Sequence, residues 1–102
     1  MFTDEKWQAY DDYQGQHKLL SVWSMYNVDN FDDVSGIAGK QLVYAEHWGD
    51  DEIRVDLPQG DLTWGQLWAA ADRAIRLSGD HHHVFIEQLD VRGGNVVLRT
   101  GS

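Results

Sequence analysis

The chain contains no cysteine and a single proline, and these scarcities exclude several classes of protein. Without cysteine, neither a disulfide framework nor a thiolate metal site can form, and a reducing compartment is the simplest home. No run of apolar residues approaches the roughly 20 that are needed to span a bilayer. The first residues, Met1 to Glu5, are acidic where a signal or transit peptide is basic. We therefore expect a soluble, cytoplasmic protein without a membrane segment.

Basic residues are also scarce. The chain has eight lysines and arginines against 17 aspartates and glutamates, which gives a net charge of -9. The residues before Leu62 carry this whole surplus, and the numbers of acids and bases are equal after it. The negative sign disfavours direct binding to DNA or RNA. The simplest explanation of the surplus is solubility. An alternative is an acidic mimic of nucleic acid, in which aspartates replace phosphates: Asp11, Asp12, Asp32, Asp33, Asp50 and Asp51.

The clearest helix signal in the chain begins at Thr63. The Thr63 hydroxyl can cap the helix while the Gln66 side chain reaches back to the Thr63 amide. Leu62 can pack on Leu67 as a hydrophobic staple. Gly79 is placed to end the helix in the left-handed conformation.

The apolar residues of this helix recur at three- and four-residue intervals and predict one buried stripe: Trp64, Leu67, Trp68, Ala71 and Ile75. Truncation of Trp68 to alanine should therefore cost about 3–5 kcal/mol. Asp72 and Arg76 are expected to form an i,i+4 pair on the opposite, wet face. Loss of the Asp72 side chain should then cost about 0.5 kcal/mol or less.

The remaining segments complete an α+β fold. Residues 3–13 predict a short helix that Gly15 ends, and residues 29–40 predict a loop. Five segments have the composition or alternation typical of strands: 18–28, 41–48, 52–57, 81–91 and 95–100. The order α-β-β-β-α-β-β predicts a two-layer sandwich, in which an antiparallel sheet of about five strands has the helices on one face. We expect residues 1–102 to form a single α+β domain.

The last two predicted strands should form a hairpin around a Gly93-Gly94 turn. In this register the turn pairs Val91 with Val96, Leu89 with Leu98 and Glu87 with Thr100. A side-chain period of two places these residues on one face: His81, His83, Phe85, Glu87 and Leu89. The same period places these on the other: His82, Val84, Ile86 and Gln88.

Two candidate sites involve this strand. His81, His83 and Glu87, with His47 from another strand, have the donor types that suit zinc, iron or manganese. The spacing of the first three and Gly94 resembles one metal motif of the cupin barrels, but the chain has no room for the second motif. Phe85 also crowds this face, so we favour no metal site and expect no cofactor.

Glu87 and His83 could instead serve as an acid–base pair in a pocket between helix and sheet. A carboxylate in an otherwise apolar face has a raised pKa unless it is partnered. The simpler alternative places Glu87 near the sheet edge, in contact with water or Arg99.

Tryptophan is abundant, with five copies in the chain. Trp64 and Trp68 lie one turn apart on the predicted stripe and are most simply core residues. Trp7 and Trp48 lie on a marginal helix and at a hairpin end. Because tryptophan is enriched where proteins meet partners, these four residues are candidates for contact with a ligand or partner.

The sequence thus leaves three hypotheses about function. The first is a small cytoplasmic binding protein, a homodimer in which a second copy covers Val84, Ile86 and Val97 on the sheet face without helices. The second is a small enzyme or ligand-binding fold that uses Glu87 and His83 in a pocket. The third is the acidic mimic. A protein or small-molecule partner fits the first two hypotheses.

Overall fold

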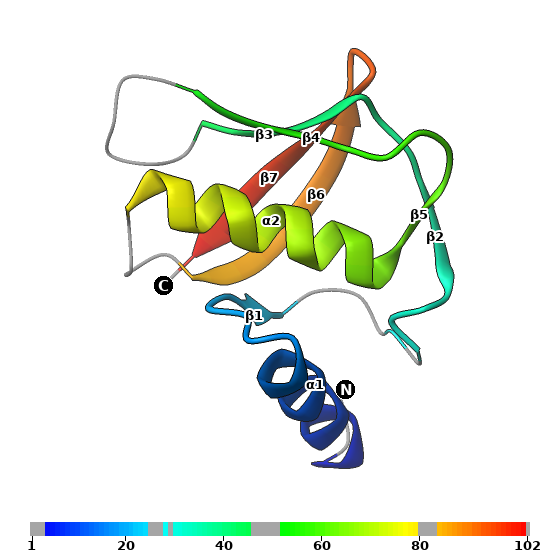
Figure 1. The fold of residues 1–102 in the computed structure, drawn as a ribbon, viewed down its shortest axis with the longest axis vertical. Helices are drawn as coiled ribbons and strands as arrows, with labels where there is room; N and C mark the ends of the chain where they lie inside the picture. The colour runs from blue at the N-terminus through cyan, green and yellow to red at the C-terminus, as the bar shows by residue number, and fades with distance from the viewer. Residues whose placement is uncertain (1–3, 25–27, 29, 46–51, 80–83, 102) are drawn as a thin grey trace.

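In the computed structural model, residues 4–24, 28, 30–45, 52–79 and 84–101 are described, with side chains from residue 8 onward. The elements of these residues are α1 (Asp4–Gln16), β1 (Val22–Trp23), β2 (Val34–Ile37), β3 (Gln41–Tyr44), β4 (Ile53–Asp56), β5 (Leu62–Thr63), α2 (Trp64–Ser78), β6 (Phe85–Arg92) and β7 (Asn95–Gly101). Helix α2 lies across one face of the main sheet, and α1 lies beside β1 (Figure 1). The predicted α+β class is therefore confirmed.

Helix α2 begins and ends as its sequence predicts. The Gln66 N–H donates to the Thr63 Oγ1 at 3.1 Å, and the Thr63 N–H donates to the Gln66 Oε1 at 2.9 Å. This is the predicted capping box. Gly79 has φ 74° and donates its N–H to the Arg76 carbonyl. Because only glycine adopts this conformation at little cost, it ends the helix.

The main sheet has the strand order β1-β6-β7-β3-β4 and contains all five predicted strands. The prediction of an antiparallel sheet is wrong, because β1 runs parallel to β6 and β3 runs parallel to β7. The physical reason is the crossover. Helix α2 carries the chain back along the sheet, so that the β6–β7 hairpin enters beside β3 instead of continuing from β4.

Two predicted segments differ from the structure in their extent. Helix α1 continues through Gly15 to Gln16, and a turn follows in which the Leu19 N–H donates to the Gln14 carbonyl. Of the strand predicted for residues 18–28, the described residues form only Val22–Trp23. The predicted start of the first helix at Thr3, residues 25–27 of that strand, and residues 46–51 and 80–83 lie outside the described residues.

Residues 29–40 are not simply a loop, as the sequence predicts. Strand β2 pairs with β5 in a separate two-stranded antiparallel sheet. The Ser35 Oγ donates to the Leu62 carbonyl at 2.7 Å. The short strand β5 ends where α2 begins, so the backbone just before the helix supplies the partner. The side chains of β2 are half-buried or exposed, which leaves its sequence without a strong strand pattern.

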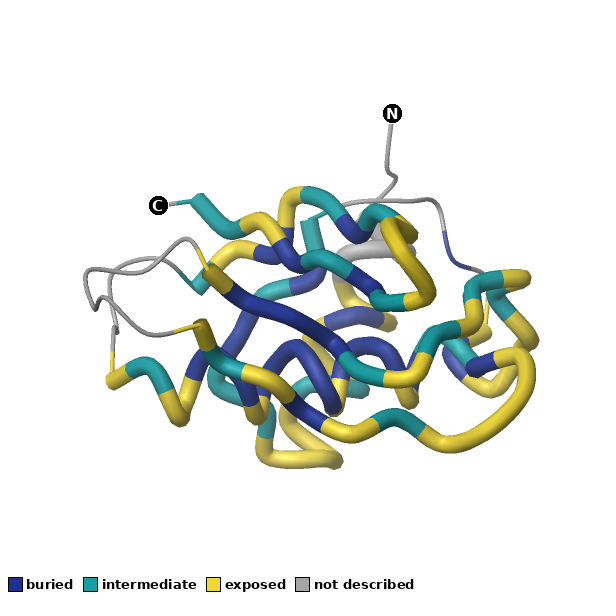
Figure 2. The backbone as a smooth tube through the Cα atoms, turned by 90° about the horizontal axis from the view of Figure 1, so that it is seen from above, coloured by how far each residue is buried: buried dark blue, intermediate teal, exposed yellow. Residues whose placement is uncertain are grey.

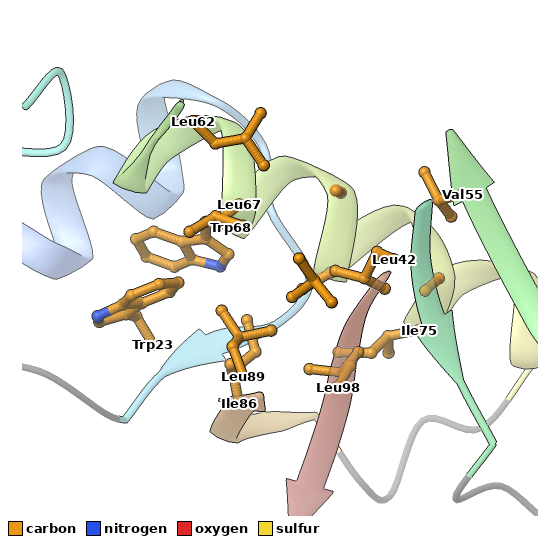
Figure 3. Close-up of a cluster of buried hydrophobic side chains, with 14 of the residues drawn as sticks. Trp23, Leu42, Val55, Leu62, Leu67, Trp68, Ile75, Ile86, Leu89 and Leu98 are labelled. Carbon is orange, nitrogen blue, oxygen red and sulfur yellow. The ribbon is translucent and has the colours of Figure 1, made fainter. Parts of the chain in front are cut away.

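The core lies between α2 and the sheet, and the predicted stripe of α2 faces it. Four stripe residues are at most 1% exposed, and Trp64 is half-buried. They meet Leu42, Ile86 and Leu98 from the strands (Figure 3). Both members of the predicted staple, Leu62 and Leu67, are fully buried. Seen from above, most of the buried stretches gather in the middle of the molecule, while the described parts of its rim are largely half-buried or exposed (Figure 2).

Aromatic rings attach α1 to this core. Tyr13 stacks on Phe31 with ring centroids 4.6 Å apart and on Trp68 at 5.3 Å. The Tyr10 hydroxyl accepts the Val28 N–H at 2.8 Å. A short helix of low amphipathicity is marginal alone, so these contacts are what hold α1 in place.

The face of α2 that carries Asp72 is not wet, and this prediction is wrong. Asp72 is only 4% exposed, and its Oδ1 accepts both the Ser21 N–H and the Ser21 Oγ–H at 2.7 Å. Its Oδ2 accepts the Arg76 Nε–H at 2.6 Å, which confirms the predicted pair. The Trp68 Nε1–H donates to the Ser21 Oγ at 3.0 Å. The turn after α1 packs on this face and brings Ser21 to Asp72, 51 residues away in sequence.

Candidate functional site

Strand β6 contains a bulge at Glu87, which changes the predicted register. Ile86 pairs with Thr100 and Gln88 pairs with Arg99, so the predicted pairing of Glu87 with Thr100 is wrong. Beyond the bulge, Leu89 pairs with Leu98 and Val91 with Val96, as predicted. The extra residue at the bulge breaks the period of two. Ile86 and Leu89, which a regular period of two places on opposite faces, therefore both face the core.

Glu87 is exposed, and its carboxylate lies against the backbone of Gly101. A side chain at position 101 would collide with that carboxylate. Glu87 thus lies on the outer surface of the sheet, as in the simpler of the two alternatives. It lines neither of the two cavities described below, and its suggested acid–base partner, His83, lies outside the described residues.

The proposed metal site cannot be assembled from described residues alone, because three of its four ligands, His47, His81 and His83, lie outside them. Within the part of the chain that the structure describes, no three histidine, aspartate or glutamate side chains could hold a metal ion together.

The four candidate tryptophans differ in their surroundings. Trp68 is 1% exposed and lies in the core, while the half-buried Trp64 packs edge-on against Trp23. The side chain of Trp7, within α1, and the whole of Trp48 are not described.

The face of the main sheet opposite α2 is the candidate site, and we call it the open face. No described helix packs against it. Because Ile86, Leu98, Leu42 and Val55 point toward α2, their strand neighbours point to the open face. Two pairs of apolar residues on adjacent strands lie there, namely Val22 with Phe85 and Val43 with Val97. Phe85 is 39% exposed, whereas Val43 is only 6% exposed. Val84 and Ile86 pack in the core, so of the three predicted interface residues only Val97 lies on this face.

The charges of the open face are nearly balanced. Its bases are Arg54, Arg92 and Arg99, and its acids are Glu52, Asp56, Glu87 and Asp90. Arg54 contacts Glu52 at 2.6 Å and donates to the Gln41 Oε1, and Gln41 donates to Asp56. Arg92 lies 3.8 Å from Asp90. A surface of this composition stands out on a chain whose net charge is -9. The sequence does contain these charges, but only the register shows that they share a face.

The structure contains a cavity between helix and sheet, as the second hypothesis requires, but at other residues. This cleft of about 490 Å³ is lined by Gln41, Arg54, Val55, Asp56, Arg73 and Leu77. A second cavity, of about 500 Å³, is lined in part by Lys40, Leu57 and Gly94. The first cleft offers two arginines, one aspartate and an exposed leucine, a set of side chains that can bind a charged or polar ligand.

Four of the six aspartates of the mimic hypothesis lie on α1 or just after Phe31, which packs against α1. Asp11 and Asp12 on α1 and Asp32 and Asp33 after Phe31 are all exposed, whereas Asp50 and Asp51 are not described. The pKa of Tyr13 is raised above its usual 10.0 by burial and, secondarily, by the negative charge of Asp32. Asp32 therefore lies close enough to α1 to act on Tyr13.

Comparison of the chain with protein-family models, with curated proteins and with solved structures finds no match. Among the described residues, no helix is long and apolar enough to cross a membrane.

Proposed function

We propose that the chain is a small binding protein that forms a homodimer through the open face. The observation that carries this proposal is the near balance of charge on that face, on a molecule that is strongly acidic elsewhere. Two copies with a net charge of -9 each repel one another across most of their surfaces. The open face, with three bases against four acids, adds little to this repulsion.

The arrangement of the open face also suits a two-fold interface. In such an interface both subunits contribute the same patch. A contact between two different residues therefore occurs twice, once on each side of the two-fold axis. A face that carries both arginines and carboxylates can place unlike charges opposite each other. The exposed part of Phe85 and the neighbouring Val22 would be buried between the copies. A stable interface of this kind buries about 800 Å² on each partner.

Sedimentation equilibrium at micromolar concentration tests this proposal. We expect a mass of twice the 11.7 kDa of the chain. The variant Phe85→Lys places two like charges in the interface and should give monomers. Val34→Lys is the matched control, because Val34 is 61% exposed on β2 and away from the open face. A wild-type mass near 11.7 kDa, or dimers that survive Phe85→Lys, would contradict the proposal.

A further inference from the structure

The outer edge of β4 has unpaired backbone groups. Strand β4 is the last strand on its side of the main sheet, and no other described strand pairs with this edge. The Leu57 N–H donates to the Lys40 carbonyl at 3.0 Å, and in this register the ladder continues by hydrogen bonds at Val55 and Ile53. The backbone N–H and C=O groups of Arg54 and Asp56 therefore point away from β3. Such an edge is a template for one more strand.

The cleft lies along this edge, and α2 forms its other wall. Val55 is 7% exposed, and Leu77 of α2 is 58% exposed. Arg73 is exposed and has no ion pair or hydrogen bond with any described side chain. Acids outnumber bases by about two to one in this chain. An exposed arginine without an ion pair is therefore unexpected and points to a partner from another molecule.

The spacing of the α2 wall matches that of an extended peptide. Arg73 and Leu77 lie one helical turn apart, which separates them by roughly 6 Å. Side chains on one face of a strand repeat every two residues, or about 6.6 Å. Two side chains of an added strand, two residues apart, can thus lie beside Arg73 and Leu77 at once.

We propose that this cleft binds an extended peptide segment as an added strand on β4, with an acidic side chain beside Arg73 and an apolar side chain beside Leu77. The backbone of Arg54 and Asp56 supplies the hydrogen bonds, and the two α2 residues select the sequence. The Asp56 carboxylate, which also lines the cleft, is already engaged, because it accepts the Gln41 side-chain amide at 2.8 Å. This binding mode differs from the dimer interface, because it uses the sheet edge and not the open face.

An NMR titration tests the proposal with two peptides, acetyl-Thr-Glu-Thr-Val-Thr-amide and acetyl-Thr-Val-Thr-Glu-Thr-amide. The two orders allow for both directions of an added strand. One of them should shift the backbone amide signals of Arg54 and Asp56. Arg73→Gln should weaken that binding by about ten-fold. Arg92→Gln is the matched control, because it makes the same change of charge on the open face and should alter the affinity by less than about two-fold.

Three outcomes would overturn the proposal. The first is that neither peptide shifts the amides of Arg54 and Asp56. The second is that Arg73→Gln and Arg92→Gln have equal effects. The third is that a peptide N-methylated at alternate amides, which cannot add as a strand, binds as well as its parent. Sedimentation of Arg73→Gln separates this proposal from the dimer, since the variant should keep the mass of the wild type. A change to monomer would assign the cleft to a second copy and would also overturn the proposal.

Discussion

Asp72 connects three segments of the chain through one buried carboxylate. Ser21 follows α1, Trp68 and Arg76 belong to α2, and the Arg76 guanidinium also donates to the Lys18 carbonyl at 2.7 Å. The Gln14 side chain of α1 donates to the Ser21 carbonyl as well. Buried hydrogen bonds to a charged group contribute more to stability than exposed ones, and their donors are costly to leave unpaired. The turn between α1 and β1 is therefore fixed by polar contacts and not by apolar ones alone.

We expect Asp72→Ala to lower the free energy of unfolding by about 2–4 kcal/mol, because the Ser21 N–H and hydroxyl lose their buried acceptor. Urea unfolding followed by tryptophan fluorescence measures this change. Asp12→Ala removes an exposed helical aspartate and should stay within about 0.5 kcal/mol of the wild type. Equal effects of the two substitutions would mean that the Asp72 network contributes little.

The position of Glu87 shows what residue patterns can and cannot reveal. The sequence does carry one signal of the bulge, because Ile86 and Leu89 are both apolar and three residues apart, which a regular strand cannot place on one face. The contact of Asp72 with Ser21 has no such signal. It joins residues 51 positions apart, and the i,i+4 pair with Arg76 is equally compatible with a wet or a buried face.

At the scale of elements, α1 depends on one close approach to α2. Gly65 lies in the first turn of α2, where a Cβ atom would collide with the Tyr13 hydroxyl and lie 3.1 Å from the Phe31 carbonyl oxygen. The Gly65 N–H donates to that same carbonyl at 2.8 Å. The lack of a side chain at this position therefore allows Tyr13 to stack on Trp68, and with it allows α1 to dock.

The two helical glycines should respond to alanine in opposite directions. Gly15 of α1 has nothing within 4 Å of an added Cβ, so Gly15→Ala should stabilise the protein by about 0.5–1 kcal/mol. Gly65→Ala should destabilise it by about 1–3 kcal/mol, because Tyr13 must move. Thermal unfolding followed by circular dichroism compares the two variants. If both stabilise the protein equally, then Tyr13 does not hold α1 against α2.

The elements that the sequence predicts well are those that local residues determine. The capping box, the left-handed Gly79 and the Gly93-Gly94 turn depend on neighbours within a few positions, and all three occur as predicted. The direction of β7 beside β3 and the pairing of β2 with β5 depend on segments far apart in the chain. The candidate site also depends on segments that are far apart in the chain. The open face combines residues of five strands, and it becomes visible only when the strand order and the bulge are known.

For the whole molecule, charge sets how the proposed dimer should respond to salt. Each copy carries a net charge of -9, whereas the open face itself is almost neutral. Salt screens the long-range repulsion between copies, with a Debye length of about 10 Å at 0.1 M. We therefore expect the dissociation constant to fall when sodium chloride rises from about 0.05 M to about 0.5 M. Sedimentation at the two concentrations measures it, and weaker association at high salt would show that ion pairs across the interface dominate instead.

The order of the strands has a consequence for how the protein is made. Strand β7 lies in the middle of the main sheet, between β6 and β3, yet it follows every other strand in the chain. During synthesis β3 and β4 leave the ribosome long before the strand that joins them to β6, so their pairing with the rest of the sheet waits for residues 95–101. A nascent chain that ends before Asn95 exposes two strand edges at once, which makes it a substrate for chaperones and prone to aggregation. Completion of this sheet thus waits for β7, the last of its described strands to be synthesised.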